Sequence, residues 1–158
     1  MRPLLTYALF IVAVVACGLL IGINNIPGEW YQSLQKPPFN PPNWIFAPVW
    51  TTLYVIIGYV GARTFLQDRR SRGVGLWRSR AMRFWGAQML FNFAWSPLFF
   101  GFHEIALALI FVLALLISVY AFIAVSWRQD RLSAWLFMPY AAWVSFATLL
   151  NGSILLLN

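Results

Sequence analysis

Residues 105–126 read IALALIFVLALLISVYAFIAVS, a run of 22 residues without a charged side chain. A helix rises about 1.5 Å per residue, so a run of this length can cross the hydrocarbon core of a bilayer, which is roughly 30 Å thick. Its apolar residues do not alternate with polar ones, as they would in a strand of a membrane barrel. The run therefore predicts a transmembrane helix.

The rest of the chain extends this prediction. Of its 158 residues, 61% are hydrophobic and 9% are charged, and a soluble domain of this composition would expose one large apolar surface. We predict an all-α integral membrane protein with one domain, residues 1–158, folded as a five-transmembrane-helix bundle. The fourth helix has few polar side chains and is expected to be the most exposed to lipid. The helices are expected at about residues 4–23, 47–66, 84–102, 105–126 and 132–157, with a proline-rich outer loop at 24–46.

Basic residues are distributed unequally between the two ends of this bundle. If the helices alternate in direction, ten arginines fall at the end that holds the N-terminus, and Lys36 falls at the other end. Positive residues concentrate in cytoplasmic loops, so we expect a cytoplasmic N-terminus and an inner-membrane location. Juxtamembrane arginines contact anionic lipid, which explains the net charge of +7 without a nucleic-acid partner. The arginines are Arg2, Arg63, Arg69, Arg70, Arg72, Arg78, Arg80, Arg83, Arg128 and Arg131.

The first residues of the chain also resemble a signal segment. Arg2 precedes a short apolar core, and small residues precede Cys17, a pattern that is typical of cleavage or lipidation. The apolar run continues to Ile23, however, so we interpret it as a spanning helix. Cys17 is the one cysteine in the sequence, which excludes an internal disulfide and a cysteine metal cluster.

The outer loop enters the second helix through PGEWYQSLQKPPFNPPNWIFAPVWTTLY, residues 27–54. This segment holds six of the nine prolines and three of the nine tryptophans. Because proline fixes φ and lacks an amide proton, we expect the loop to be extended and stiff, with no helix, and to hold its aromatic side chains at defined angles. A rigid loop at the end of a membrane bundle favours a role as a lid that covers a bound ligand.

Aromatic and amide side chains share one face on three of the predicted helices. Gln88 and Asn92 are expected to face the bundle interior, because lipid cannot hydrogen-bond their amides. Seven residues of these faces lie at similar depth in the outer half and predict an apolar, aromatic-walled cavity: Trp50, Tyr54, Asn92, Trp95, Trp143, Ala147 and Asn151. The alternative is a packed core in which buried amides only join neighbouring helices. The residues are Trp50 and Tyr54 on the second helix, Trp85, Gln88, Asn92, Trp95 and Phe99 on the third, and Tyr140, Trp143, Ala147 and Asn151 on the fifth.

Three segments carry a family resemblance: GEWYQSLQKPPFNPPNWIFAPVWTTLY (28–54), AQMLFNFAWSPLFFG (87–101) and PYAAWVSFATLLN (139–151). Together they resemble the TspO/MBR family of translocator proteins and tryptophan-rich sensory proteins, in a bacterial form. The resemblance implies a bacterial membrane, the inner one by the arginine distribution, with the outer membrane as the alternative because family members have been placed there. The resemblance implies a five-helix bundle, often a homodimer, with a pocket that the first loop caps and that accepts porphyrins and flat synthetic ligands. Animal relatives carry a tyrosine and a basic residue near the end of the fifth helix. The segment LLNGSILLLN (149–158) has neither, so sterol binding there is not expected.

The same resemblance assigns a lid and a pocket wall. Trp50 and Trp143 would offer flat faces to a tetrapyrrole and are candidates for the light- and oxygen-dependent porphyrin breakdown in which bacterial relatives are implicated. Ala147 would leave room beside the ligand, and Asn92 would hydrogen-bond a ligand carbonyl or carboxylate. The implied lid is Trp30, Tyr31, Pro41 and Pro42, and the implied wall is Trp50, Tyr54, Asn92, Trp95, Trp143 and Ala147.

The implied function is a membrane receptor or sensor that binds protoporphyrin IX and haem-like tetrapyrroles, with membrane lipid and a second copy of the chain as partners. A transporter or carrier of the same ligand is the alternative, although the spans lack charges that would couple to an ion gradient. Conventional acid–base catalysis is not expected, because the four carboxylates lie in loops or at span ends. No obligatory cofactor and no metal site are expected. His103, the one histidine, lies in a turn where solvation or capping explains it, and an axial haem ligand is the alternative role.

Overall fold

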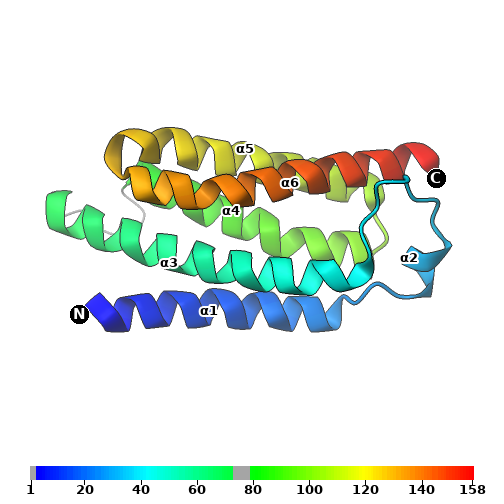
Figure 1. Cartoon of the computed structure of the whole chain (residues 1–158), viewed down its shortest axis with the longest axis horizontal. Helices are drawn as coiled ribbons and strands as arrows, with labels where there is room; N and C mark the ends of the chain where they lie inside the picture. The colour runs from blue at the N-terminus through cyan, green and yellow to red at the C-terminus, as the bar shows by residue number, and fades with distance from the viewer. Residues whose placement is uncertain (1–2, 73–78) are drawn as a thin grey trace.

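The computed structural model describes residues 3–72 and 79–158. All regular structure within these residues is helical, and the long helices lie side by side (Figure 1). A short helix and a 3-10 turn interrupt the outer loop, and a π-helical turn extends the third long helix. In chain order the elements are α1 (Pro3–Asn24), α2 (Glu29–Ser33), η1 (Asn43–Ile45), α3 (Phe46–Arg72), α4 (Arg80–Ser96), η2 (Pro97–Gly101), α5 (Ile105–Gln129) and α6 (Arg131–Leu157).

The long helices confirm the predicted membrane bundle. Among the described residues, α1, α3, α5 and α6 are each long and apolar enough to cross a bilayer. The helix α4 is shorter, but η2 continues it to Gly101 through the hydrogen bond from the Phe102 amide to the Pro97 carbonyl at 2.8 Å. The chain is therefore an integral membrane protein with a bundle of helices.

Two helix ends differ from those predicted. α3 continues past residue 66 to Arg72, and α4 begins at Arg80 instead of residue 84. Apolar composition marks the edge of the membrane, whereas the helices run on through arginine-rich segments, because arginine is a good helix former in water. The side chain of Ser79 accepts a hydrogen bond from the Met82 amide at 3.0 Å and caps the start of α4.

The prediction that the outer loop contains no helix was wrong. Between Pro27 and Pro37 the sequence is free of proline, and the segment Glu29–Ser33 forms α2, with the Gln32 amide donating to the Gly28 carbonyl at 3.1 Å. Each proline disrupts helix only near its own position, so a short helix can form between Pro27 and Pro37. Figure 1 shows α2 beyond the end of the bundle, on the side where the C-terminus lies.

The helices pack in a closed order in which α1 contacts α3, α3 contacts α6, α6 contacts α5, α5 contacts α4 and α4 contacts α1. The interior is filled by fully buried side chains, among them Ile57, Phe122, Phe137 and Tyr140. Gly58 lets α3 approach α1 closely, because a Cβ at this position would lie 2.6 Å from the Cα of Ile11. The outer half of the bundle, between α1, α3 and α4, is less tightly filled.

The most exposed span is α1, not the fourth long helix α5 as expected. In the most apolar 18-residue window of each helix, 17% of the residues of α1 are buried, compared with 39% of those of α5. The buried residues of α1 are Thr6, Val14 and Gly18. Apolar composition does not distinguish a helix that packs on three neighbours from one that packs on few, because both are made of the same side chains.

The described arginines gather at one end of the bundle, opposite α2. There Arg63 of α3 binds Asp130, the residue between α5 and α6, through Nε to Oδ2 at 2.6 Å and Nη2 to Oδ1 at 3.0 Å. The hydroxyl of Ser133 also donates to Asp130, at 2.7 Å. This ion pair fixes the second half of α3 to the α5–α6 turn. Of the arginines used to predict orientation, Arg2 and Arg78 lie outside the described residues.

Candidate functional site

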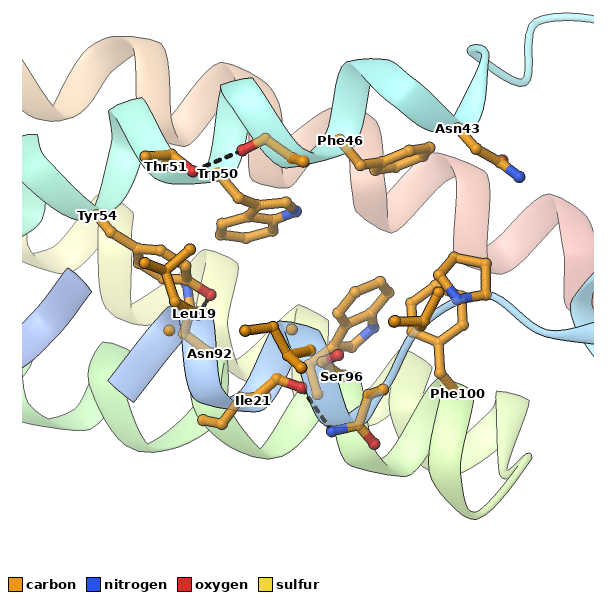
Figure 2. A pocket seen from close by; sticks show the side chains of 18 of the residues that line it. Leu19, Ile21, Asn43, Phe46, Trp50, Thr51, Tyr54, Asn92, Ser96 and Phe100 are labelled. Atoms are coloured by element: carbon orange, nitrogen blue, oxygen red, sulfur yellow. Dashed lines mark hydrogen bonds between the residues drawn. The ribbon is translucent and has the colours of Figure 1, made fainter. Parts of the chain in front are cut away.

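A cavity of about 530 Å³ lies in the half of the bundle next to the outer loop. Three helices enclose it: the last turns of α1, the first turns of α3 and the last turns of α4. Its lining is mostly apolar, and its size is within the range of small-molecule sites, about 300 to 1,000 Å³. Figure 2 shows side chains of α3 and α4 facing each other across this hollow, with Leu19 and Ile21 of α1 beside them.

The helix α3 contributes an aromatic wall. Trp50 and Tyr54 are four residues apart, so they lie on one face, and their rings stack with centroids 5.5 Å apart. Trp50 is half-buried, and Tyr54 is buried beside Gly18 of α1, where a Cβ would collide with the Tyr54 ring. Gly18 therefore serves close packing inside the bundle. Both aromatic residues line the cavity, where the sequence placed them.

The helix α4 forms the opposite wall with Trp95 and Asn92. The Trp95 indole donates to the Asn151 side chain of α6 at 3.0 Å, and the Asn151 amide donates to the Ile105 carbonyl of α5 at 3.0 Å. The Trp95 ring also stacks on Phe99, with centroids 5.4 Å apart. These contacts fix the indole against the cavity, so the wall is formed before any ligand binds.

Asn92 belongs to a chain of buried hydrogen bonds that joins three helices. The Tyr54 hydroxyl donates to Asn92 Oδ1 at 3.3 Å, Asn92 Nδ2 donates to the Tyr140 hydroxyl at 2.7 Å, and the Tyr140 hydroxyl donates to Gln88 Oε1 at 2.8 Å. Tyr54 and Asn92 line the cavity, whereas Tyr140 and Gln88 lie behind them and are fully buried. Gln88 and Tyr140 were predicted to face inward but were not assigned to the site.

The four predicted lid residues do not line this cavity. Tyr31 of α2 packs against η2, with its ring 5.3 Å from that of Phe100, and its hydroxyl donates to the Asn40 side chain at 3.0 Å. Burial raises the pKa of the Tyr31 hydroxyl above its usual value. Trp30 stacks on His103, and Pro41 and Pro42 lie farther along the loop.

The two ends of the outer loop frame the cavity instead. Asn25 and Pro27 follow α1, and Asn43 and Trp44 precede α3, and all four line the hollow. Residues of α1, such as Gly22, complete the lining. Sequence reasoning missed the residues of α1 because this helix is apolar on every side, and no periodic pattern marks which side faces the cavity.

Trp143 and Ala147 of α6 do not line the cavity either. Trp143 borders a second hollow, a groove of about 640 Å³ between α3 and α6 that includes Thr52 and Phe146. Phe46 stands between the two hollows: it lines the cavity, and its ring meets the Trp143 ring edge-on at 5.9 Å. Ala147 is buried and lines neither of the hollows described here. Trp143 is therefore one aromatic ring away from the cavity.

Comparison with known proteins supports the resemblance. The chain matches the TspO/MBR family over residues 10–157. It is 37% identical to Protein CrtK of Rhodobacter capsulatus and 36% identical to a Tryptophan-rich sensory protein of Cereibacter sphaeroides, each over 154 residues that cover 96% of this chain and 92% of the relative. It is 39% identical to a Translocator protein of Ovis aries over 138 residues, 85% of this chain and 79% of the relative. The chain therefore belongs to the TspO/MBR family.

Proposed function

We propose that this protein is a membrane receptor that binds porphyrins, such as protoporphyrin IX, and other flat hydrophobic ligands in the cavity between α1, α3 and α4. The observation that carries the proposal is the wall made by Trp50, Tyr54 and Trp95 around a mostly apolar hollow. Flat aromatic ligands bind favourably against indole and phenol rings, and the few polar groups of the lining can orient them. The names of its relatives, sensory and translocator proteins, support a role in ligand sensing or transfer.

Packing below the cavity favours a receptor over a transporter. Toward the arginine-rich end, the core beneath Tyr54 is filled by Ile57 and Val60, which have 0% exposure. A ligand in the cavity therefore rests on close-packed side chains. Passage across the bilayer would require α3 to separate from its neighbours, against the burial of these side chains.

We also propose an orientation and an assembly. Basic residues concentrate on the cytoplasmic side of membrane proteins, so the arginine-rich end would face the cytoplasm of a bacterial cell, with the protein in the inner membrane. The cavity would then open near the outer surface. The sparsely buried face of α1 is available for a second copy of the chain, and disulfide cross-linking through exposed Cys17 would detect such a homodimer.

The structure also has tryptophans where light-dependent breakdown of a bound porphyrin would need them. Trp50 lines the cavity and would lie against the ligand, and Trp143 lies behind Phe46. Oxygen would be the oxidant: Trp50 would pass an electron to it and recover one from the porphyrin, so that the porphyrin is oxidised, oxygen is reduced and the tryptophan is restored. Exposure of bound porphyrin to light in air tests this extension, because loss of the porphyrin absorption bands in the parent but not in Trp50→Phe would support it. Equal rates of loss in both would remove Trp50 from the chemistry.

The binding proposal is tested by titrating protoporphyrin IX into the protein in nanodiscs while tryptophan fluorescence is followed. Trp50→Leu removes a wall ring and is expected to weaken binding about tenfold. Trp135→Leu is the matched control, because Trp135 is 59% exposed and lies near the start of α6, at the opposite end of the bundle. Saturable binding with the same affinity in Trp50→Leu and Trp135→Leu would show that the porphyrin does not occupy this cavity.

A further inference from the structure

We infer that ligands reach the cavity sideways, from the lipid around the bundle, through a gap between the last turns of α1 and the first turns of α3. The inference rests on the proposed use of the cavity as a ligand site, and it restricts the ligands to molecules that dissolve in the membrane. The residues that border this lateral gap all line the cavity: Leu19, Gly22 and Ile23 of α1, Trp44 of η1, and Ala47 and Thr51 of α3.

The helix α1 packs closely on α3 as far as Gly18 and loses this contact in the next turn. A Cβ at Gly18 would collide with the Tyr54 ring of α3, and a Cβ at Gly58 would collide with the backbone of α1. Gly22 lies one turn farther out, on the same face of α1 as Gly18. There, no described atom lies within 4 Å of a Cβ, apart from the chain neighbours of Gly22 and the backbone of α1 itself. Gly22 is therefore not covered by α3.

Apolar side chains at the edges of the gap are exposed. Leu19 is 45% exposed, Ile23 is 67% exposed and Trp44 is 73% exposed. A side chain that lines a cavity and is also exposed lies where the cavity meets the molecular surface. Leu19 lies five residues before the end of α1, about 8 Å along the helix axis, and α1 is long and apolar enough to cross a bilayer. The cavity therefore meets the surface at a depth where acyl chains surround the protein.

The opposite side of α1 is closed by η2, the extension of α4. A Cβ at Gly101 of η2 would lie 2.9 Å from Oδ1 of Asn25, the residue that follows α1. With 3.6 residues in each turn of α1, Leu19 and Ile23 lie on one side of Gly22, and Asn25 lies on the other side. The exposed edge is therefore on the side of α1 that is away from η2, and the gap opens between α1 and α3.

The outer loop is held in place, so it offers a less direct way in. The Gln35 amide donates to Asn158 Oδ1 at 3.0 Å, and Asn158 Nδ2 donates to the Gln35 carbonyl at 3.0 Å. Farther back in the loop, α2 is held by the contacts with η2 and His103 described above. Opening the loop breaks these contacts, whereas widening the lateral gap requires rotamer changes of exposed side chains such as Leu19 and Ile23, which are fast.

Entry from the membrane determines the class of ligand. A flat apolar molecule concentrates in the bilayer and meets the gap at the depth of Trp50, the first ring of the cavity wall. A molecule that stays in water does not reach the gap. The ligands are therefore planar, membrane-soluble compounds.

The first test measures binding rates in variants that fill the gap. Gly22→Phe places a ring in the gap from α1, where a Cβ has open space, and Ala47→Phe does so from an exposed position on α3. Protoporphyrin IX is mixed with the protein in nanodiscs, at a lipid concentration at which uptake by empty nanodiscs is complete within the mixing time, and tryptophan quenching follows association. Association should be about tenfold slower than in the parent. Dissociation into an excess of empty nanodiscs should slow by a similar factor, because the ligand leaves through the same gap.

Two further variants complete this test. Leu20→Phe is the matched control, because Leu20 is exposed on α1 but does not line the cavity, and it should keep the parent's rates. Asn158→Ala releases the loop at Gln35 and should also keep them. Parent-like rates in both folded gap variants, or faster association in Asn158→Ala, would overturn the inference.

The second test detects the gap without a ligand. Thr51 lines the cavity beside the gap and is half-buried. A nitroxide label on Thr51→Cys, with Cys17→Ser removing the native cysteine, should collide more often with oxygen, which dissolves in lipid, than with a water-soluble nickel complex. The same label on exposed Thr52→Cys provides the reference for lipid, and on exposed Gln35→Cys the reference for water. A Thr51 label that prefers the nickel complex would show that the cavity opens to water and would refute lateral entry.

The two tests separate this inference from the proposed function. Porphyrin binding with parent-like rates in Gly22→Phe and Ala47→Phe would overturn lateral entry and leave the function standing. A lipid-accessible Thr51 label without porphyrin binding would overturn the proposed ligand and leave the lateral gap standing.

Discussion

Arg63 and Asp130 form a two-point ion pair that joins the second half of α3 to the turn between α5 and α6, with the guanidinium contacting both carboxylate oxygens. The Arg63 side chain is 32% exposed and that of Asp130 is 10% exposed. A pair that is only partly exposed and has two parallel hydrogen bonds is stronger than a typical surface ion pair. Together with the hydrogen bond from Gln67 Nε2 to the Gln129 carbonyl at 2.9 Å, it joins α3 to the end of α5 and the start of α6 at the arginine-rich end of the bundle.

We predict that Asp130→Asn lowers the free energy of unfolding by about 1 to 3 kcal/mol, because it weakens the hydrogen bonds and leaves a partly buried guanidinium without its counter-charge. Arg63→Gln should have a similar effect. The double variant should be less destabilised than the sum of the two single variants, because the same interaction is lost only once. Thermal unfolding in detergent measures all three, and strictly additive effects would show that the pair contributes nothing.

The same carboxylate predicts a pH dependence. Burial raises the pKa of Asp130, but the hydrogen bonds from Arg63 and Ser133 and the charge of Arg63 outweigh burial and hold the pKa below its usual value. A carboxyl group with a lower pKa in the folded state stabilises the protein above the unfolded pKa, and this contribution is lost as the pH falls through the folded pKa.

The difference in unfolding temperature between the parent and Asp130→Asn should therefore be largest near neutral pH and should shrink below about pH 4, near the unfolded pKa of an aspartate. Thermal scans at a series of pH values between neutral and acid measure it. Glu104→Gln is the control, because Glu104 is an exposed carboxylate without an ion pair to a described residue. A difference that stays constant across the series would contradict the assignment.

The sequence predicted the membrane spans well because lipid imposes its requirements on composition. A stretch of about 20 apolar residues has few alternatives to a spanning helix, and each of the five runs proved to be helical. The ends of α3 and α4 were not predictable in this way, since helix continues into arginine-rich segments outside the bilayer. The short helix α2 was not predictable from the proline count, because a proline excludes helix near its own position and not from the whole loop.

The site was predictable within a helix but not between helices. Spacings of three and four residues correctly placed Trp50 beside Tyr54, and Asn92 beside Trp95. The same rule cannot give the rotation of α6 about its axis, which depends on packing. Tyr140 fills the space that faces Trp50, with ring centroids 6.5 Å apart, and Trp143 is turned to the far side of Phe46. The single cavity predicted from the sequence therefore corresponds to two separate hollows in the structure, the cavity lined by Trp50 and the groove bordered by Trp143.

Trp30 and His103 provide a third prediction, on how α2 is held. Their rings stack with centroids 4.1 Å apart and an interplanar angle of 15°. His103 has a φ of 60°, in the left-handed region that asparagine tolerates about as well as histidine. His103→Asn should therefore keep the backbone turn and remove the stack, which is worth about 0.5 to 1.5 kcal/mol.

Hydrogen exchange at the α2 amides measures this loosening, and residues 29–33 should exchange faster in His103→Asn by up to about tenfold. Phe102→Ala is the matched control, because Phe102 is the neighbouring residue and is 71% exposed. Protection of α2 that is the same in the parent and in His103→Asn would show that Tyr31 and its contacts with η2 hold this helix without the stack.

Gly58 provides the last prediction, on the contact between α1 and α3. A Cβ at Gly58 would lie 2.6 Å from the Ile11 Cα and 3.0 Å from the Phe10 carbonyl oxygen. Both are backbone atoms, so a rotamer change cannot relieve the overlap and the helices must move apart. Gly58→Ala should therefore lower the free energy of unfolding by about 1 to 3 kcal/mol.

Gly22→Ala is the matched control in α1, because no described atom other than the backbone of α1 itself lies within 4 Å of a Cβ there. Alanine favours helix over glycine, so this variant should be neutral or up to about 1 kcal/mol more stable. Thermal unfolding of the two variants measures the difference, and equal stability would mean that α1 can shift away from α3 without loss of packing.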